Sequence, residues 1–338
     1  MRSRNVVIAT VVAVVVIGAV VALVALRRPD PLSGFNTVRD VRLPGDTSRF
    51  DYQSFDPQKN LLFIAHLGAS EIVVYDTSTN HVVRTIDGVS DVHGVLALPS
   101  LNKVYATATG RNELDVIDER SFRVVDSIPT GDYPDGLAYD SRDDEIFVSN
   151  EAGASDTVVD ARHDRVAATI HLGGEVGNTQ YDATSGLIYV AVQTTRQGQL
   201  VAIDPRSESV VDRMPLPGCD GAHGVYLDPV HEAGFVACED NSTLVLVDLR
   251  HHEAVSSFSV GDRPDVLAFD PPRHRLYIAS ESGVLTVFAW EGSNVTKLDE
   301  GFAGPNAHSV AVDPATGLIF LPLTNVGGHP VLRELTRT

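Results

Sequence analysis

The chain has 338 residues, of which 43% are hydrophobic and 7% aromatic, so it can form a large folded core and is not a disordered protein. All 45 acidic residues lie beyond residue 28, together with only 22 of the 26 basic residues, so this part carries a net charge of −23. A body this acidic repels nucleic acid and anionic lipid, and we expect no nucleic-acid partner.

The first 28 residues predict a transmembrane helix that anchors the chain in a membrane. Residues 6–26 form a run of 21 residues without a charge, and about 20 such residues span a bilayer. A cleaved secretory signal is the alternative, but the run is longer than the apolar core of a signal peptide, and Arg27 and Arg28 follow it without a small-x-small site. We expect an anchor at 1–28, a linker at 29–35 and a folded body at 36–338.

The orientation of this anchor follows from the charges on its two sides. Arg2 and Arg4 nearly balance Arg27 and Arg28, and the amino terminus adds one more positive charge to the first side. Because positive flanks stay in the cytoplasm, we expect the body outside it, in the periplasm or at the cell surface.

Seven copies of one pattern fill the rest of the chain. Each has a strand, a polar turn that is often Asp-Pro, and a second strand, as in YQSFDPQKNLLFIA and VLAFDPPRHRLYIA. The residue before the turn recurs at intervals of 42, 42, 42, 46, 42 and 43 residues: Asp56, Leu98, Asp140, Asp182, Asp228, Asp270 and Asp313. Four strands fit this period, which predicts an all-β, seven-bladed β-propeller of four-stranded blades.

Two further positions of the repeat predict core and turn residues. An aromatic residue stands seven positions after each aligned residue: Phe63, Tyr105, Phe147, Tyr189, Phe235, Tyr277 and Phe320. Their small and β-branched neighbours favour a buried strand face over a solvent-facing stacking platform. A third strand ends in an acid that we expect to start a turn in five copies: Asp76, Asp118, Asp160, Asp204 and Asp248. Trp290 takes this place in the sixth copy.

The seventh copy is too short for a fourth strand, because only two residues follow Thr336. The stretch TVRDVRLPGD at residues 37–46 has the fourth-strand pattern and precedes the first full copy. We therefore expect residues 37–43 to complete the last blade, which would close the ring and remove an exposed sheet edge.

The repeat can be compared with known families. Its Asp-Pro turn, followed by an aromatic, a hydrophobic residue and Ala and then by a VxVID-like strand, resembles the YVTN-type repeats of YncE-like β-propellers over residues 36–336. The Gly-His and Trp-Asp signatures of WD40 repeats are missing. Proteins with this repeat include extracytoplasmic and surface-layer proteins and propeller subunits of amine dehydrogenases, so the resemblance implies the fold and leaves the activity open.

Asp or His occupies one further repeat position in six of the seven copies. Five residues before each aligned residue stand Asp51, His93, Asp135, Gly177, His223, Asp265 and His308. The resemblance implies that the innermost strand begins on the ligand-binding face, so these side chains would ring the mouth of the central channel. The second strand returns to this face and adds His66, Asn150, Glu151, Gln193, Glu239 and Glu281, and Asn178 follows the gap at Gly177.

Two interpretations of this ring are open. A small polar side chain at a tight strand entry can cap the turn by bonding backbone amides. Converging imidazoles and carboxylates can instead bind a ligand, through Asp51, His93, Asp135, Glu151, Asn178, His223, Glu239, Asp265, Glu281 and His308. A divalent metal ion is a possible cofactor, although the fold requires none. Its candidate ligands are Asp51, His93, Asp135, His223 and His308.

These observations support two hypotheses of function. The first is a membrane-anchored, extracytoplasmic binding module that takes a protein partner or a small ligand at the channel mouth. The second is a metal-dependent hydrolase or lyase. Propeller lactonases and streptogramin-type lyases place a divalent cation at the channel mouth, and Asp135-Gly136 and Asn178 resemble the motifs of those enzymes. A phosphate-binding Gly loop, GxSxG and CxxC are absent from the sequence, and whether the protein is an enzyme stays open.

The chain has two cysteines, both in the fifth copy. Cys219 precedes the innermost strand and Cys238 ends the second, so hairpin pairing places them near the same face. An oxidising compartment would allow a disulfide between them, and the alternative is a free Cys238 near His223.

Overall fold

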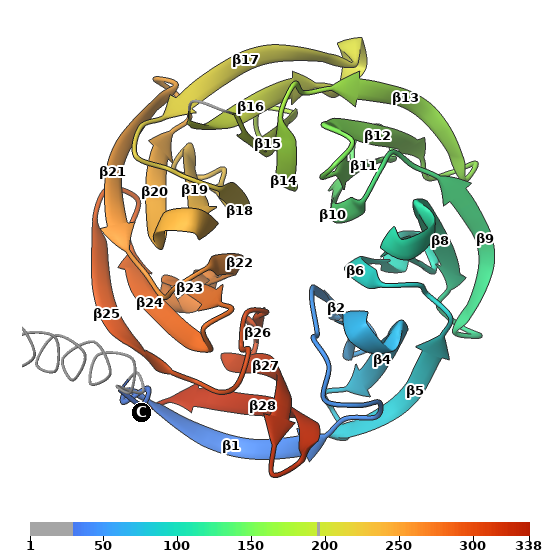
Figure 1. Ribbon diagram of the computed structural model, residues 1–338, viewed down its shortest axis with the longest axis vertical. Helices are drawn as coiled ribbons and strands as arrows, with labels where there is room; N and C mark the ends of the chain where they lie inside the picture. Colours follow the sequence, from blue (N-terminus) through green and yellow to red (C-terminus); the bar gives the residue numbers. More distant parts are fainter. Residues whose placement is uncertain (1–29, 195–196) are drawn as a thin grey trace, which may run out of the picture. The chain divides into compact units, whose positions relative to one another are not determined.

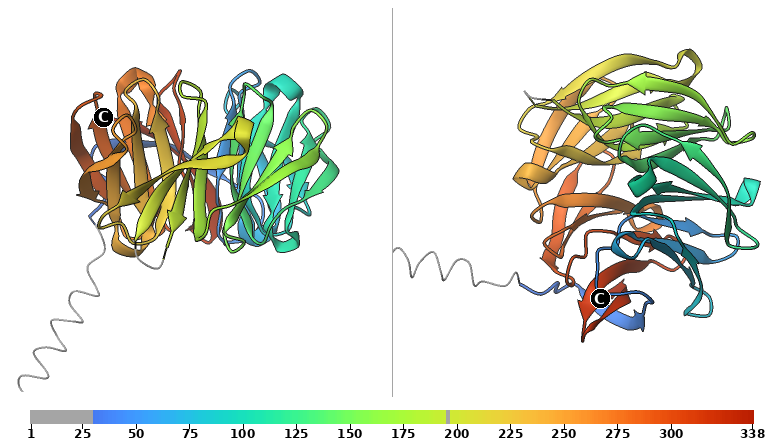
Figure 2. Two further views of the ribbon diagram at one scale, coloured as in Figure 1. Left: turned by 90° about the horizontal axis from the view of Figure 1, so that it is seen from above. Right: turned by 45° about the vertical axis from the view of Figure 1, so that its right-hand side comes forward.

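Seven four-stranded antiparallel sheets form a closed ring in the computed structural model, which describes residues 30–194 and 197–338 (Figure 1). The compact unit Leu32–Thr338 begins inside the predicted linker. Seen from the side, neighbouring sheets stand face to face (Figure 2). In the described part of the chain, no helix has the length and apolar character needed to cross a membrane. The anchor predicted at residues 6–26 lies outside that part.

Each sheet is one blade, whose strands run outward from the centre of the ring (Figure 1). The innermost strands are β2 (Gln53–Asp56), β6 (Val92–Leu98), β10 (Pro134–Asp140), β14 (Glu175–Asp182), β18 (Ala222–Asp228), β22 (Pro264–Asp270) and β26 (Ala311–Asp313). The second strands are β3 (Leu61–His66), β7 (Lys103–Ala108), β11 (Glu145–Asn150), β15 (Leu187–Gln193), β19 (Ala233–Cys238), β23 (Arg275–Ser280) and β27 (Leu318–Val326).

The outer half of each blade repeats the same order. The third strands are β4 (Glu71–Asp76), β8 (Glu113–Asp118), β12 (Ser155–Asp160), β16 (Gly198–Asp204), β20 (Thr243–Asp248), β24 (Val284–Trp290) and β28 (His329–Arg337). The outermost strands are β5 (His81–Asp87), β9 (Arg123–Pro129), β13 (Arg165–His171), β17 (Ser209–Leu216), β21 (Glu253–Ser259), β25 (Val295–Phe302) and β1 (Phe35–Arg42). Short 3-10 turns lie at Leu67–Ala69, Pro99–Leu101, Thr109–Arg111, Pro205–Ser207, Glu239–Asn241 and Pro271–Arg273.

The seven repeated aromatic residues lie on the second strands and form the core between blades. None is more than 4% exposed, which confirms that they pack in the core. Phe147 of the third blade, for example, belongs to one apolar cluster with Val176 and Ile188 of the fourth. Burying a side chain of this kind contributes about 1.5–3 kcal/mol, so each aromatic residue helps to join neighbouring sheets.

The acids that end the innermost and third strands cap turns. Asp140 Oδ1 accepts a hydrogen bond from Arg142 N at 2.8 Å, and Asp76 Oδ1 accepts one from Ser78 N at 2.8 Å. The turn role predicted for the third-strand acids is therefore confirmed at Asp76, and Asp140 at the end of the innermost strand caps its turn in the same way. Trp290 differs, because its indole Nε1 donates to Asp228 Oδ2 at 2.6 Å and so ties the sixth blade to the fifth.

Every outermost strand carries a β-bulge at the same place. The register of each outer pair skips one residue: Val38, Val83, Val125, Ala167, Val211, Val255 and Leu298. A bulge bends and twists an edge strand, which hinders its pairing with another chain. The repeat thus protects the seven strand edges that the ring leaves on its circumference.

The last blade is built from both ends of the body. Strand β1 pairs antiparallel with β28, from Phe35 opposite Arg337 to Arg42 opposite Val331. Its bounds, Phe35–Arg42, are close to the predicted 37–43. Side chains reinforce the pairing, because Arg39 Nε lies 2.9 Å from the buried Glu334 carboxylate.

Removing β1 should open the ring. We expect a chain without residues 1–46 to expose the edge of β28 and to aggregate, whereas a chain without residues 1–30 keeps β1 and should remain folded and monodisperse. Light scattering and thermal unfolding of the two truncated proteins compare them directly. Equal stability and equal dispersity would contradict the role given to β1.

Candidate functional site

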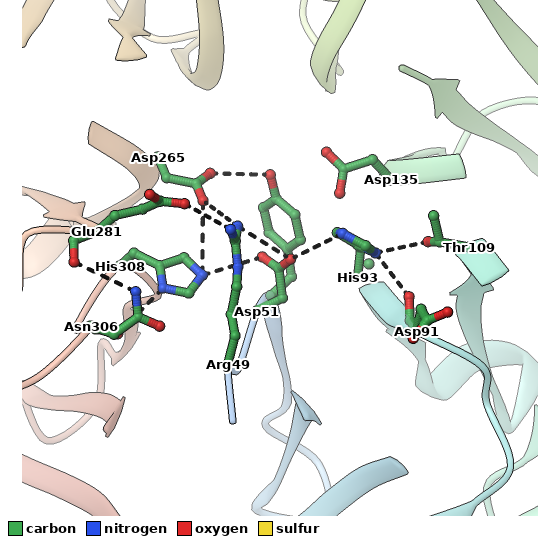
Figure 3. A network of polar contacts seen from close by, with 12 residues as sticks. Arg49, Asp51, Asp91, His93, Thr109, Asp135, Asp265, Glu281, Asn306 and His308 are labelled. Atoms are coloured by element: carbon green, nitrogen blue, oxygen red, sulfur yellow. Dashed lines mark hydrogen bonds and ion pairs between the residues drawn. The ribbon is translucent and has the colours of Figure 1, made fainter. Parts of the chain in front are cut away.

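Six acidic and imidazole side chains meet at one end of the central channel, and Figure 3 labels all of them except His223. We call them the rim residues: Asp51, His93, Asp135, His223, Asp265 and His308. Asp51 lies between two imidazoles, with Oδ1 3.7 Å from Nε2 of His308 and Oδ2 3.9 Å from Nε2 of His93. His223 Nε2 lies 3.6 Å from Asp135 Oδ2 and 3.5 Å from Asp265 Oδ1. The structure therefore brings all six predicted side chains together.

The innermost strands are crowded where they enter the channel. A Cβ atom on Gly94 would lie 2.2 Å from the carbonyl oxygen of Asp135, and one on Gly224 would lie 1.9 Å from that of Asp265. The residue after a rim residue must therefore be small at these blades. The gap at Gly177 has the same steric cause, because a Cβ there would lie 2.6 Å from the Cα of His223.

Two of the three rim imidazoles are oriented by backbone carbonyls. His93 Nδ1 lies 2.8 Å from the carbonyl oxygen of Asp91, and His308 Nδ1 lies 3.3 Å from that of Asn306. A carbonyl oxygen only accepts, so each Nδ1 donates. His308 Nε2 then faces Asp51 and Asp265, and His93 Nε2 lies 3.2 Å from the Tyr133 hydroxyl and 3.9 Å from Asp51 Oδ2. Metal-binding histidines are held in this way by outer hydrogen bonds.

The rim carboxylates do not behave like the turn acids. Both oxygens of Asp51, Oδ1 of Asp135 and Nε2 of His308 are buried without a hydrogen-bond partner among the described residues. In the part of the chain that the structure describes, no backbone amide donates to these atoms, whereas Arg142 N donates to Asp140 Oδ1. Leaving a buried polar group unpaired costs about 1–3 kcal/mol, and more for a charge. Turn capping therefore does not account for Asp51 or for Oδ1 of Asp135.

The donor atoms fit a divalent metal ion. Two groups of three residues place one ligand atom each within 4.8 Å of the others: Asp51, Asp265 and His308, and Asp51, His93 and Asp135. Carboxylate oxygen combined with imidazole nitrogen suits the borderline ion Zn²⁺, and the oxygen-rich set also suits Mn²⁺, whereas Ca²⁺ takes oxygen ligands alone. His223 belongs to neither group, although the sequence made it a candidate ligand.

Five of the six rim residues line a polar pocket of about 190 Å³, which we call the mouth pocket, whereas His308 does not. Glu151, Glu239 and Glu281 also line it, as the sequence predicts. Besides Tyr52, three lining residues were not predicted: Arg49, Tyr133 and Arg263. Each stands two positions before a rim residue, so the repeat register contained the signal that would have found them.

Tyr52 also reaches the rim residues from a position that the sequence did not single out. It follows Asp51, where three other copies have Gly. Its hydroxyl donates to Asp265 Oδ1 at 3.4 Å and lies 3.5 Å from His223 Nε2. Because Tyr52 lines both the mouth pocket and a cavity of about 280 Å³ inside the channel, it marks the boundary between them.

Four residues that the sequence predicts at the channel mouth, beside the rim residues, lie elsewhere. Asn178 lines the cavity inside the channel. The side-chain amide of Asn150 forms hydrogen bonds with Ser155, Thr157 and the backbone of Gly131. The His66 ring stacks on Phe50, with the ring centroids 3.9 Å apart. Gln193 lines a separate pocket beside Cys219. His66 and Asn150 stand ten positions after the aligned residue, whereas Glu151, Glu239 and Glu281 stand eleven after it, so the alternation of side chains along a strand points the two sets to opposite faces.

The two cysteines of the fifth blade are joined. Cys219 and Cys238 form a disulfide, with Cα atoms 5.3 Å apart, and the described part of the chain has no free cysteine. The bridge links the loop before β18 to the end of β19 and is buried in the apolar cluster between the fourth and fifth blades.

The charges of the rim residues shift one another's pKa values. Burial raises the pKa of Asp135 to about 7, and the nearby Asp51 and Asp265 add to the shift. Burial alone would lower the pKa of His223, but Asp265 and Asp135 outweigh it and raise this pKa to about 9. Burial also opposes the ionised form of Asp51, but His308, His93 and Arg49 lower its pKa overall. Without a bound cation, protons on Asp135 and His223 thus offset part of the repulsion between the rim carboxylates.

The stability of the metal-free protein should depend on the charge of His223. Its pKa is raised from 6.5 to about 9 in the folded state, so its contribution is complete below pH 6.5 and is lost as the pH rises through 9. We expect the melting temperature in the presence of chelator to fall between pH 6.5 and 9, and to fall less steeply in His223→Gln. Identical pH profiles for the two proteins would contradict this assignment.

Comparison with known proteins relates the chain to one group of propellers. No family model matches it. It is 29% identical over 96 residues to the proteins named YncE of Salmonella typhi and Salmonella typhimurium, which is 28% of this chain and only 27% of each relative. The hydrazine synthase structure of Kuenenia stuttgartiensis matches with a TM-score of 0.74 at 14% identity, over 90% of this chain and 98% of that one, a likeness of fold alone. The sequence similarity and the seven-bladed ring are together consistent with a YncE-like propeller family.

Proposed function

We propose that the propeller is a binding module whose mouth pocket holds a divalent cation and presents it to a small ligand or protein partner with oxygen donors. The observation that carries the proposal is the buried, unpartnered Asp51 carboxylate, with an imidazole Nε2 on each side of it. A cation there would satisfy both carboxylate oxygens and offset their cost of burial. The pocket above leaves room for a ligand.

We further propose that residues 1–28 hold this module at a membrane, outside the cytoplasm. The charge-free run at residues 6–26 supports the anchor. The disulfide between Cys219 and Cys238 supports an oxidising compartment, because such bonds are rare in the cytosol. The partner would then be an extracytoplasmic molecule.

A metal-dependent hydrolase or lyase is the second candidate for the same site. In its favour, the carboxyl groups of Glu151 and Glu239 line the mouth pocket beside the candidate ligands, where one of them could accept a proton from a bound water. Turnover of a panel of lactones that is abolished by chelator and restored by Mn²⁺ or Zn²⁺ would support an enzyme. Cation binding without turnover of this panel would favour the binding module.

Replacing the central carboxylate should remove cation binding. We expect Mn²⁺ or Zn²⁺ to raise the melting temperature of the wild type. Asp51→Asn should lower the affinity for the cation by more than about 100-fold, because replacing a residue that only hydrogen-bonds a metal ligand already lowers metal affinity by about 10- to 100-fold. Calorimetric titration measures the affinity. The control is Asp118→Asn, an equal charge change at an exposed acid that caps a turn. If neither ion shifts the wild type, and Asp51→Asn alters only stability, the cation proposal is wrong.

The anchor can be tested separately. Full-length protein should stay with membranes after an alkaline carbonate wash, and removing residues 1–28 should release a folded body into the soluble fraction. Fractionation followed by amino-terminal sequencing gives the answer. Recovery of a soluble mature chain that begins after residue 26 would show a cleaved signal instead.

A further inference from the structure

The two oxygens of Asp51 face two different groups of donors. Oδ1 lies 3.7 Å from His308 Nε2, and Asp265 completes that group. Oδ2 lies 3.9 Å from His93 Nε2, and Asp135 completes the other group. Figure 3 shows Asp51 between the two imidazoles, with Asp265 on the His308 side and Asp135 on the His93 side. One carboxylate therefore belongs to both candidate metal groups.

The charge of the mouth pocket exceeds what one divalent ion would neutralise. Six carboxyl groups and two guanidinium groups line it, together with His223, whose pKa is raised to about 9. With the carboxyl groups ionised, His223 protonated and His93 neutral, the net charge is −3, so one divalent cation would leave −1 and two would leave +1. The charge is therefore compatible with a second ion, and the case for two ions rests on the arrangement of the donor atoms around Asp51.

The Arg49 guanidinium lies near this carboxylate, but its nearest acidic partner is Glu281. Its Nη1 lies 2.7 Å from Glu281 Oε1, within hydrogen-bond distance. Its Nη2 is 3.8 Å from Asp51 Oδ2 and 3.6 Å from Asp265 Oδ2, too far for a hydrogen bond. The guanidinium thus leaves the Asp51 oxygens free, and its side chain is 38% exposed, so it can move towards solvent when a cation binds.

We propose that the rim residues bind two divalent transition-metal ions bridged by the Asp51 carboxylate. One ion would take Asp51 Oδ1, Asp265 and His308, and the other Asp51 Oδ2, His93 and Asp135. The inference rests on the proposed function and specifies the number of cations and the ligand that couples them. Each ion has three protein ligands, which leaves positions open to water or to a bound molecule.

Mn²⁺ serves as the probe, because equilibrium dialysis counts the bound ions and electron paramagnetic resonance reports whether they are coupled. The full-length protein, in detergent, is expected to bind two Mn²⁺ per chain and to give the broadened spectrum of a spin-coupled pair. His308→Gln and Asp135→Asn should each retain one ion with the hyperfine pattern of an isolated Mn²⁺. Asp118→Asn is the matched control and should retain the coupled pair.

The outcomes separate this inference from the proposed function. One uncoupled Mn²⁺ in the wild type would overturn the bridged pair and leave the single-cation module standing. No bound Mn²⁺ and no bound Zn²⁺ would overturn both. Loss of all bound Mn²⁺ in both His308→Gln and Asp135→Asn, with melting temperatures that show folded proteins, would mean one shared site and would also overturn the pair.

Discussion

The structure depends on how closely seven innermost strands can approach one axis. At Gly94 and Gly224 the next blade lies so near that no Cβ would fit. Strands this close carry their first side chains to the same small volume, so a repeat with Asp or His at that position concentrates charge there. Crowding in the backbone thus produces the burial of Asp51, Asp135 and Asp265, each at most 2% exposed. The perturbed pKa values of the rim residues follow from that burial.

Two sets of acids in the same repeat therefore have different roles, although only five residues separate them. Asp140 ends β10, where free backbone amides of the turn satisfy its carboxylate. Asp135 lies at the other end of that strand, in the break of the β10–β11 register between Pro134 and Leu137, and its Oδ1 has no hydrogen-bond partner among the described residues. Its side chain instead faces Asp51, His223 and the other rim residues. Position along the strand, rather than residue type, decides which acid caps a turn and which is available to a cation.

The repeat period made the blades, the buried aromatic residues and the rim predictable, because each of these depends on register within one blade. The sequence could not predict how side chains from different blades meet. Tyr52 crosses to Asp265 and His223, and Arg49 reaches Glu281, which are contacts between residues more than 150 positions apart. Asn178 was expected at the mouth but lines the channel interior, since the crowding at Gly177 displaces its blade's first polar group by one residue. The β-bulges also escaped prediction, because an extra residue in one strand leaves the 42-residue period unchanged.

The fourth blade shows what the ring itself requires. It has Gly177 where six other blades have Asp or His, and it still pairs four strands and packs against both neighbours. Ring closure therefore does not need a charged side chain at this position. Charges that are buried, unpartnered and unnecessary for closure reduce the stability of the fold, and departures of this kind from local consistency are expected at functional sites. Among the rim residues, Asp51 departs most from local consistency, because both its oxygens are buried without a hydrogen-bond partner among the described residues and it has a donor group on each side, as the proposed cation site requires.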